Sequence, residues 1–340
     1  MKTFKTLTAI LLFLFLVVTN SKIFAQTKVK YLSVKPINLN GITTPTTISG
    51  DSINGGNTMC IHLTNCSNIR ITKCKLQNST DRGIRLDNCT NITIDSCFFS
   101  GVADGVYAFQ CKGGIKVNYN QFYNMVGPVP RGHAVQFNNC NGGGMTINYN
   151  ICEIVNGTGA NPNPEVGDII NLYQSNGLHL DWIRVYGNLL RGGGTATGSM
   201  GMAGIVAGDM GGSYQDIQNN KCVNTGYVGI QVQGGSHINI MANQIYSDLL
   251  PWSALGLGCA NYSGVPSTDI TISNNQVNWQ AGYLNMKRRD TCYKPGSGVN
   301  SCARPKGWET NTVNAPLRAT TMLPVQLVNA SKFIASPIKK

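Results

Sequence analysis

The chain has 340 residues, of which 39 are glycine and only 12% are charged, whereas globular proteins average about 7% glycine and about 25% charged residues. This composition argues against an ordinary helical enzyme. Because 42% of the residues are apolar, the chain can bury a large core and is not expected to be disordered. The formal net charge of +12 favours a polyanionic partner, although charge that serves only solubility is the alternative.

The first 25 residues have the pattern of a secretory signal peptide. Lys2 and Lys5 form a positive start, residues 9–18 are an uninterrupted apolar run, and Ala25 is a small residue before the expected cleavage point. The run is too short to cross a bilayer, which needs about 20 residues; a core helix is the alternative. We therefore predict a secreted or periplasmic protein with no membrane insertion, whose polyanionic partner would be an acidic polysaccharide rather than nucleic acid.

The sequence repeats itself from residue 61 onward. Residues 61–66 and 84–89 align at an offset of 23, and the same template continues at 106–111, at 135–140 and as far as 270–272. Eight such units can be counted. Each contains two short strands in which apolar and polar residues alternate, which is the pattern of a strand with one buried face. Units this short cannot form a core alone, so they must stack on their neighbours.

Two columns of identical residues support the stacking. Asparagines follow the second strands by the same few residues: Asn120, Asn150, Asn188, Asn220, Asn243 and Asn275. Asparagine tolerates the left-handed backbone of a sharp corner, and its amide can hydrogen-bond to the next one, about 4.8 Å along the stack. Cysteines form the other column: Cys66, Cys89, Cys111 and Cys140. We expect these to be buried thiols, whereas a disulfide between Cys292 and Cys302 would stiffen the loop between them.

These features resemble those of the right-handed parallel β-helix family, over roughly residues 60–279. The resemblance implies an all-β solenoid with a single β-helix domain at residues 58–279. An N-terminal cap is then expected at 26–57, and a C-terminal cap or tail at 280–340 should cover the other end or lie along the side. We expect a monomer.

Outward-facing side chains define the surface on which a ligand can bind. The inward positions taken as equivalent are Ile84, Val106, Val135, Ile170, Ile205 and Ile230. The residues after them form one outward column: Arg85, Tyr107, Gln136, Asn171, Val206 and Gln231. Two residues further along is a second: Asp87, Phe109, Asn138, Tyr173, Gly208 and Gln233. At the preceding turn, four residues fall in register: Arg82, Asp104, His133 and Asp168. Two long insertions, 157–166 and 192–202, would wall a groove here.

An acidic polysaccharide in this groove can be cleaved by β-elimination. The enzyme must offset the uronate carboxylate, remove the C5 proton and protonate the leaving oxygen. Arg131 or Arg191 would hold the carboxylate through paired hydrogen bonds. His133 or Tyr173 would take the proton and Tyr173 would donate one, while Asp168 would fix the tautomer of His133. Substrate-binding roles are predicted for Gln136, Asn138, Asn171, Tyr107, Arg85 and Gln231.

The proposed catalytic residues also have purely structural interpretations. Asp168 can cap a turn, His133 can be a hydrogen-bonded turn residue, and Arg191 can simply hold its insertion. The tyrosines can be ordinary surface aromatics. The chemistry requires no cofactor, and no cysteine pair has zinc-site spacing with a histidine nearby. Calcium remains a candidate ligand because Asp209 lies beside glycines.

Comparison with enzyme families of this fold narrows the function. Galacturonan hydrolases share Asn-Thr-Asp, Asp-Asp, Gly-His-Gly and Arg-Ile-Lys segments, of which this chain has only Gly132-His133-Ala134, a partial match. The Arg-x-Pro-x-x-Arg segment of pectate lyases is absent. Residues 131–137, 168–175 and 190–194 resemble segments of secreted bacterial proteins in the alginate or glucuronan lyase branch. This resemblance implies a polysaccharide lyase; a non-catalytic carbohydrate-binding or cell-surface protein and a glycoside hydrolase are the alternatives.

Overall fold

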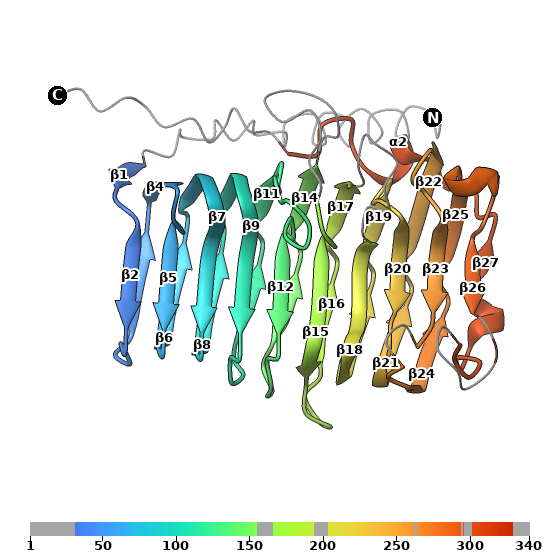
Figure 1. Cartoon of the computed structure of the whole chain (residues 1–340), viewed down its shortest axis with the longest axis horizontal. Helices are drawn as coiled ribbons and strands as arrows, with labels where there is room; N and C mark the ends of the chain where they lie inside the picture. Colours follow the sequence, from blue (N-terminus) through green and yellow to red (C-terminus); the bar gives the residue numbers. More distant parts are fainter. Residues whose placement is uncertain are drawn as a thin grey trace, which may run out of the picture.

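The structure is a computed structural model that describes residues 31–154, 166–193, 203–261, 264–293, 295 and 301–328. Within these ranges, 27 strands join in one continuous parallel sheet. The sheet winds into a right-handed parallel β-helix whose coils stack from β1 (Leu32–Val34) at one end to β26 (Thr291–Tyr293) and β27 (Thr312–Val313) at the other (Figure 1). The predicted fold class is confirmed.

Each complete coil contributes a strand to each of three faces. The front sheet, which faces the reader in Figure 1, contains β2 (Ile37–Asn40), β5 (Ile61–Thr64), the later parts of β7 (Lys75–Asp87) and β9 (Phe98–Phe109), β12 (Val135–Asn138), β15 (Ile170–Asn176), the start of β18 (Ala203–Gln218), β20 (Val228–Val232), β23 (Leu255–Cys259) and β26. The second sheet contains β3 (Thr46–Ser49), β6 (Ser67–Thr72), β8 (Thr90–Asp95), β10 (Lys116–Asn118), β13 (Thr146–Asn148), β16 (Ile183–Tyr186), the end of β18, β21 (Gly235–Met241) and β24 (Ser267–Ser273).

The third sheet contains β1, β4 (Asp51–Gly56), the early parts of β7 and β9, β11 (Gln121–Tyr123), β14 (Ile151–Ile154), β17 (Leu189–Gly192), β19 (Lys221–Val223), β22 (Gln244–Leu250), β25 (Gln276–Ala281) and β27. The repeat pattern predicted only two strands per unit. The additional strand was missed because in β7 and β9 it runs on without a break into the front sheet of the next coil.

At both ends of the described part of the chain, the segments expected to be caps extend the stack rather than only covering it. Residues 31–56, expected to form a cap, contain β1 to β4, and β1, β2 and β3 pair in register with β4, β5 and β6. At the other end β26 and β27 add to β23 and β25. Further along, helix α2 (Ala319–Met322) and the residues around it pack on the third sheet in an apolar cluster with Val223, Ile151 and Leu189. The C-terminal segment therefore lies both at the end and along the side.

The predicted asparagine column forms a buried ladder at the corner between the second and third sheets. From Asn120 to Asn275, each Nδ2 donates to Oδ1 of the next asparagine at 2.8–3.1 Å, and Asn311 provides a further rung. The left-handed corner conformation predicted for these asparagines belongs instead to the residue before each one, such as Tyr119 or Asn219. The asparagine side chain holds adjacent coils together because its amide both donates and accepts in the stacking direction.

The core consists of the inward columns of isoleucine, valine and leucine. The six inward positions identified from the repeat are paired in consecutive front strands and are at most 1% exposed. All twelve cysteines are free thiols, and those of the cysteine column are buried. The disulfide suggested between Cys292 and Cys302 is not formed, since the Cys302 thiol donates to the Cys259 carbonyl at 3.2 Å.

Two sequence-based expectations lie outside the described residues, namely the signal peptide at 1–25 and most of the two insertions at 157–166 and 192–202. Among the described helices, none is long and apolar enough to span a membrane.

Candidate functional site

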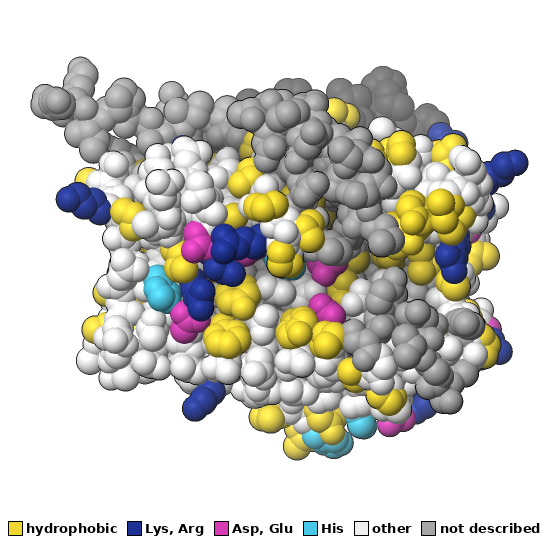
Figure 2. Space-filling view, viewed as in Figure 1, with side chains coloured by type: hydrophobic (Ala, Val, Ile, Leu, Met, Phe, Trp, Pro, Cys, Tyr) yellow, Lys and Arg dark blue, Asp and Glu magenta, His cyan; other side chains and the backbone are white. Residues whose placement is uncertain are grey.

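A pocket of about 350 Å³ lies on the front sheet, where the strands β7, β9, β12, β15 and β18 run side by side. Its lining is polar and aromatic: Arg82, Asp104, Tyr107, Pro130, Arg131, His133, Gln136, Asn138, Gly167, Asp168, Asn171, Tyr173 and Asp209. Figure 2 shows arginine and acidic side chains gathered on this face over β5, β7 and β9. Five consecutive coils thus contribute to one site, which we call the front pocket.

His133 and Asp104 form a buried pair in the front pocket. Asp104 lies in β9 and is 1% exposed, and His133 lies in the turn before β12 and is 4% exposed. The carboxylate oxygen Oδ1 of Asp104 accepts hydrogen bonds from the backbone N–H groups of Gly132 at 2.7 Å and of His133 at 3.1 Å, and it lies 3.2 Å from ring nitrogen Nδ1 of His133. Since an ionised carboxylate only accepts, Nδ1 carries the proton. In the neutral ring, Nε2 is therefore the nitrogen that can accept a proton.

The charges of this pair stabilise each other. Burial alone would lower the pKa of His133, but the hydrogen bond and charge of Asp104, with the charges of Asp168 and Asp209, outweigh it and raise that pKa. Burial likewise opposes ionisation of Asp104, but the hydrogen bond and charge of His133, with the charge of Arg82, lower its pKa overall. An ionised aspartate beside a readily protonated histidine is an arrangement suited to proton transfer.

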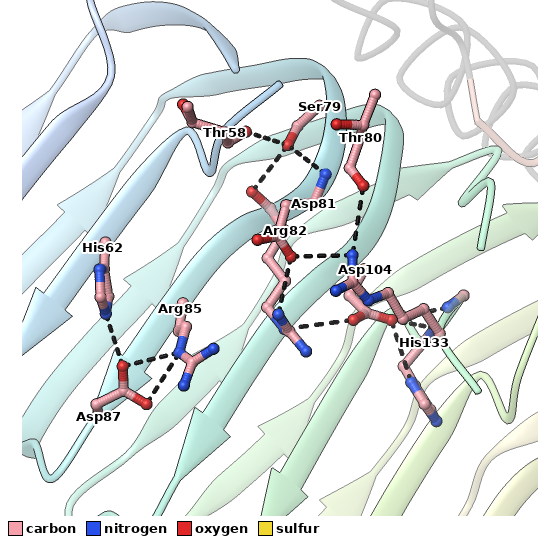
Figure 3. Close-up of polar contacts among 12 residues, drawn as sticks. Thr58, His62, Ser79, Thr80, Asp81, Arg82, Arg85, Asp87, Asp104 and His133 are labelled. Carbon is pink, nitrogen blue, oxygen red and sulfur yellow. Dashed lines mark hydrogen bonds and ion pairs between the residues drawn. The ribbon is translucent and has the colours of Figure 1, made fainter. Parts of the chain in front are cut away.

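Two arginines border the same wall of the pocket. Figure 3 shows Arg82 between Asp81 and Asp104, with His133 beyond. The Arg82 guanidinium lies 2.8 Å from Asp81 and 3.4 Å from Asp104, and it stacks over the Tyr107 ring with 4.2 Å to the centroid. The Nε atom of Arg82 is buried and makes no hydrogen bond to any described residue. Arg131 shares Asp81 at 3.2 Å. Asp81 lies beside both guanidinium groups and Arg82 also faces Asp104, so among the described residues Arg131 has Asp81 as its only ion-pair partner.

A second acidic pair lies on the neighbouring coils. The amide nitrogen Nδ2 of Asn171 donates to Oδ2 of Asp168 at 2.7 Å and to Oδ2 of Asp209 at 2.8 Å, so these two oxygens are at most 5.5 Å apart. Gln136 donates to Oδ1 of Asn171 at 3.3 Å. Burial raises the pKa of Asp168, and burial together with the charge of Asp168 raises the pKa of Asp209. Two close carboxyl groups with raised pKa values favour a state in which one is protonated.

A β-bulge brings Asp209 to this position. The repeat placed Gly208 opposite Tyr173, but the structure pairs Asn171 with Val206 and then Tyr173 with Asp209, so that β18 has one extra residue there. Gly208 has a φ of +62°, a backbone conformation that glycine adopts without strain. The bulge re-aims the following side chain toward the pocket.

The structure brings eight of the eleven predicted site residues together in the front pocket: His133, Tyr173, Arg131, Asp168, Gln136, Asn138, Asn171 and Tyr107. Arg85 lies at the edge, where it pairs with Asp87 at 2.8 Å and lies 5.7 Å from the centre of the Tyr107 ring. Gln231 is on the same sheet but lines a different pocket.

Arg191 does not belong to the site. It lies in β17 on the third sheet, 3.0 Å from the Glu153 carboxylate, and it also donates to the carbonyls of Pro324 and Val325 in the C-terminal segment. Its donors hold the C-terminal segment, which is a structural role other than the predicted one of holding the insertion at 192–202. The prediction that Asp168 fixes the tautomer of His133 is also wrong, since Asp104 rather than Asp168 is hydrogen-bonded to the His133 ring.

Sequence reasoning gave Arg82 and Asp104 no role in the site and considered Asp209 only as a calcium ligand. Arg82 and Asp104 had been placed in register with His133 at the turn, and this register was the available signal for a role in the site. Asp209 could not be found in this way, because the bulge shifts its register by one residue. Among the described residues, no group of three or more His, Cys, Asp and Glu side chains is arranged to hold a metal ion.

Comparisons with known proteins agree with the architecture. The profile of the family described as "Right handed beta helix region" matches residues 14–141. No curated protein sequence gives a significant match. Among solved structures, the enzymatically active domain of tailspike protein 2 from bacteriophage CBA120 is similar, with 12% identity and a TM-score of 0.44 over 88% of this chain and 50% of that one. This chain thus spans half the length of that domain.

Two other solved structures are more distantly similar. One is an alginate lyase from a Paenibacillus strain, with 9% identity and a TM-score of 0.34 over 82% of this chain and 92% of that one. The other is the A-module of a mannuronan C-5 epimerase from Azotobacter vinelandii, with 13% identity and a TM-score of 0.23 over 85% of this chain and 92% of that one. At these levels none of the three carries an argument about function, which must come from the front pocket itself.

Proposed function

We propose that the chain is an exported polysaccharide lyase that cleaves a uronate-containing polymer by β-elimination in the front pocket. The observation that carries the proposal is the buried His133–Asp104 pair beside the incompletely hydrogen-bonded guanidinium of Arg82. A base next to a carboxylate-binding group is what proton abstraction next to a uronate carboxyl requires.

The groups of the pocket supply each step of the reaction. Arg82 and the side-chain amide of Gln136 bind the uronate carboxylate, which withdraws electron density from C5. His133 Nε2 then removes the C5 proton. The electron pair of the C5–H bond forms the C4–C5 double bond as the C4–O bond breaks, and the Tyr173 hydroxyl donates its proton to the leaving oxygen. The products are an unsaturated uronate and a new chain end, with no net consumption of water.

The aspartates of the pocket are compatible with an acidic substrate. Asp104 is compensated by His133 and Arg82. The raised pKa values of Asp168 and Asp209 favour a protonated carboxyl in that pair, and a protonated carboxyl can donate a hydrogen bond to a substrate carboxylate instead of repelling it. Arg131 remains nearby as a second positive group.

Asp168 and Asp209 also support a second candidate, a glycoside hydrolase. Their Oδ2 atoms accept from the same amide nitrogen and are at most 5.5 Å apart, which excludes the separation of about 6.5–9.5 Å in inverting glycosidases and leaves the retaining class. In that case the protonated member would be the acid and the ionised member the nucleophile. The bulge in β18 brings Asp209 to the same amide as Asp168 and so supplies the second carboxyl group of this pair.

The test is incubation of the purified protein with alginate, glucuronan and pectin while ultraviolet absorbance of unsaturated products and new reducing ends are followed in parallel. Lyase action gives both signals, and His133→Gln should abolish both. Hydrolase action gives reducing ends without absorbance, and Asp209→Asn should abolish them.

The matched control is His179→Gln, since His179 lies on an exposed loop away from the pocket. It should keep wild-type activity. Absorbance that persists in His133→Gln overturns the assignment of the base. Binding of an acidic polymer without any product would instead favour the non-catalytic carbohydrate-binding protein.

A further inference from the structure

A second pocket, of about 260 Å³, lies on the same front sheet toward the C-terminal end. It is lined by residues of β20, β23 and β26 and of the segments next to these strands: Tyr227, Val228, Gln231, Ala254, Leu255, Cys259, Ala260, Arg289, Cys292 and Tyr293. The nearest front-pocket strand, β18, is hydrogen-bonded directly to β20. We call this second site the distal pocket.

The distal pocket continues the outward row of the front pocket. Strand pairing aligns Asn171 with Val206, Val206 with Gln231, Gln231 with Gly258 and Gly258 with Cys292. Neighbouring strands are about 4.8 Å apart, so the distal pocket extends from roughly 10 Å to roughly 19 Å beyond Asn171 along the stack. Val206, which lies between the two pockets in this row, is buried in an apolar cluster against which Tyr227 and Leu255 pack. A polymer held in the front pocket therefore crosses these side chains and reaches the distal pocket a few sugar residues later.

Arg289 gives the distal pocket a positive charge that no described acidic side chain neutralises. Its guanidinium donates to the Cys292 thiol at 2.8 Å and to the Met286 thioether at 3.9 Å, and sulfur is a weak acceptor. Within the described ranges it forms no ion pair, whereas the adjacent Arg288 pairs with Asp290 at 2.7 Å. A half-buried guanidinium whose side-chain partners are sulfur atoms retains the capacity to bind a carboxylate through paired hydrogen bonds.

The shape of the distal pocket suits a sugar ring. Tyr227 packs edge-on against Tyr283, and Tyr293 packs edge-on against Trp308, each with 5.0 Å between ring centres. These contacts hold two amphipathic rings at the pocket wall. Gly258 keeps the centre open, because a Cβ there would lie 2.8 Å from the Leu255 side chain and 3.6 Å from that of Gln231.

We propose that the distal pocket is a subsite that binds the carboxylate of a second uronate residue on the polymer held in the front pocket, with Arg289 as the binding group. This proposal rests on the proposed function for the identity of the polymer. It predicts that affinity depends on chain length, since only an oligosaccharide long enough to reach both pockets gains the contact with Arg289.

Cys292 provides a readout that needs no catalysis. It is half-buried in the distal pocket, whereas the other eleven cysteines are buried. Alkylation at Cys292 can therefore be followed by mass spectrometry in the inactive His133→Gln variant. Long uronate oligosaccharides should slow alkylation of Cys292, and uronate trimers or neutral oligosaccharides of equal length should not. Adding Arg289→Gln should remove the protection, while adding Arg288→Gln should leave it.

Kinetics in the active protein give the complementary test. Arg289→Gln should raise KM for long oligosaccharides about tenfold, which corresponds to about 1.4 kcal/mol, with kcat and the KM for trimers unchanged. Arg289→Lys should lie between wild type and Arg289→Gln, because lysine keeps the charge and loses the forked geometry. Arg288→Gln is the matched control.

The outcomes separate this inference from the proposed function. Equal behaviour of Arg289→Gln and Arg288→Gln toward long oligosaccharides overturns the subsite and leaves the lyase assignment standing. If Cys292 is protected in a length-dependent and Arg289-dependent way but the wild-type protein shows no turnover, the subsite is supported and the lyase assignment is overturned. Absence of binding to every acidic oligosaccharide overturns both.

Discussion

Replacement of Asn188 by alanine tests whether the asparagine ladder holds the coils that build the front pocket. Asn188 is in the same coil as β15 and is fully buried. Its Oδ1 accepts from the N–H of Asn150 at 2.9 Å and from Nδ2 of Asn150 at 3.0 Å, and its Nδ2 donates to the carbonyl of Ile147 at 2.8 Å and to Oδ1 of Asn220 at 2.9 Å.

Alanine removes all four of these hydrogen bonds and leaves buried partners without a substitute. A buried hydrogen bond contributes about 1 kcal/mol net, so Asn188→Ala should lower the free energy of unfolding by about 4 kcal/mol. Typical single substitutions cost about 0.5–3 kcal/mol, so the expected loss is well above the background. The matched control is Asn239→Ala, because Asn239 points outward from β21 between the buried residues Ile238 and Ile240.

Urea unfolding followed by fluorescence of the four tryptophans measures the loss, and hydrogen exchange at the Asn150 amide locates it. The backbone N–H of Asn150 should exchange much faster in Asn188→Ala than in wild type, since its acceptor, Oδ1 of Asn188, is gone. If Asn188→Ala lowers the free energy of unfolding no more than Asn239→Ala does, or if exchange at the Asn150 backbone amide is unchanged, the ladder does not hold the coils in the way described.

Three further predictions concern the front pocket. Asp104→Asn should lower the pKa of His133, because burial then outweighs the remaining charges; NMR titration of the four histidine rings measures it, and a midpoint that does not fall contradicts the pairing. The raised pKa of His133 stabilises the folded protein at pH values below the pKa of an unfolded histidine, about 6.5, and this contribution is lost as the pH rises through the pKa of His133 in the folded protein. Asp104→Asn should therefore also destabilise the protein more at about pH 6 than at about pH 9. Asp209→Asn should raise the unfolding temperature at about pH 8 but not at about pH 3, because the raised pKa of Asp209 penalises the folded state only once the carboxyl ionises; equal shifts at both pH values would refute this. Gly167→Ala should lower turnover about tenfold, because its Cβ would lie 3.0 Å from the backbone carbonyl oxygen of Arg131 and 3.1 Å from Nε2 of His133 and would displace the ring by a few tenths of an ångström; wild-type turnover would show that the ring position is not critical.

The repeat made the stacking predictable from the sequence. Ile84, Val106 and Val135 could be aligned because a buried column demands similar side chains at every coil, and the alignment carried Tyr107 and Gln136 to their correct places in the outward row. The asparagine column was recognisable for the same reason, although its residues use the side-chain amide and not the left-handed backbone.

The local departures from the repeat could not be predicted. The bulge at Gly208 changes which residue faces the pocket, and nothing in the alternation of β18 marks the extra residue. The register of the turn places an aspartate on each side of His133, Asp104 and Asp168, and the repeat gives no signal for which of the two is hydrogen-bonded to the His133 ring. Arg191 was misplaced because the corner at Asn188 directs β17 onto the third sheet, where its partners come from the C-terminal segment.

The front pocket draws Asp104, His133, Asp168 and Asp209 from four successive coils, one from each. Its chemistry is therefore modular along the solenoid axis. Excision of one entire coil would let the flanking coils close up with the hydrophobic columns still matched, yet it would delete all the polar groups that this coil gives to the pocket and set its former neighbours directly against each other. Gain or loss of whole coils could thus exchange one constellation for another in a lineage of such proteins while the scaffold survives intact.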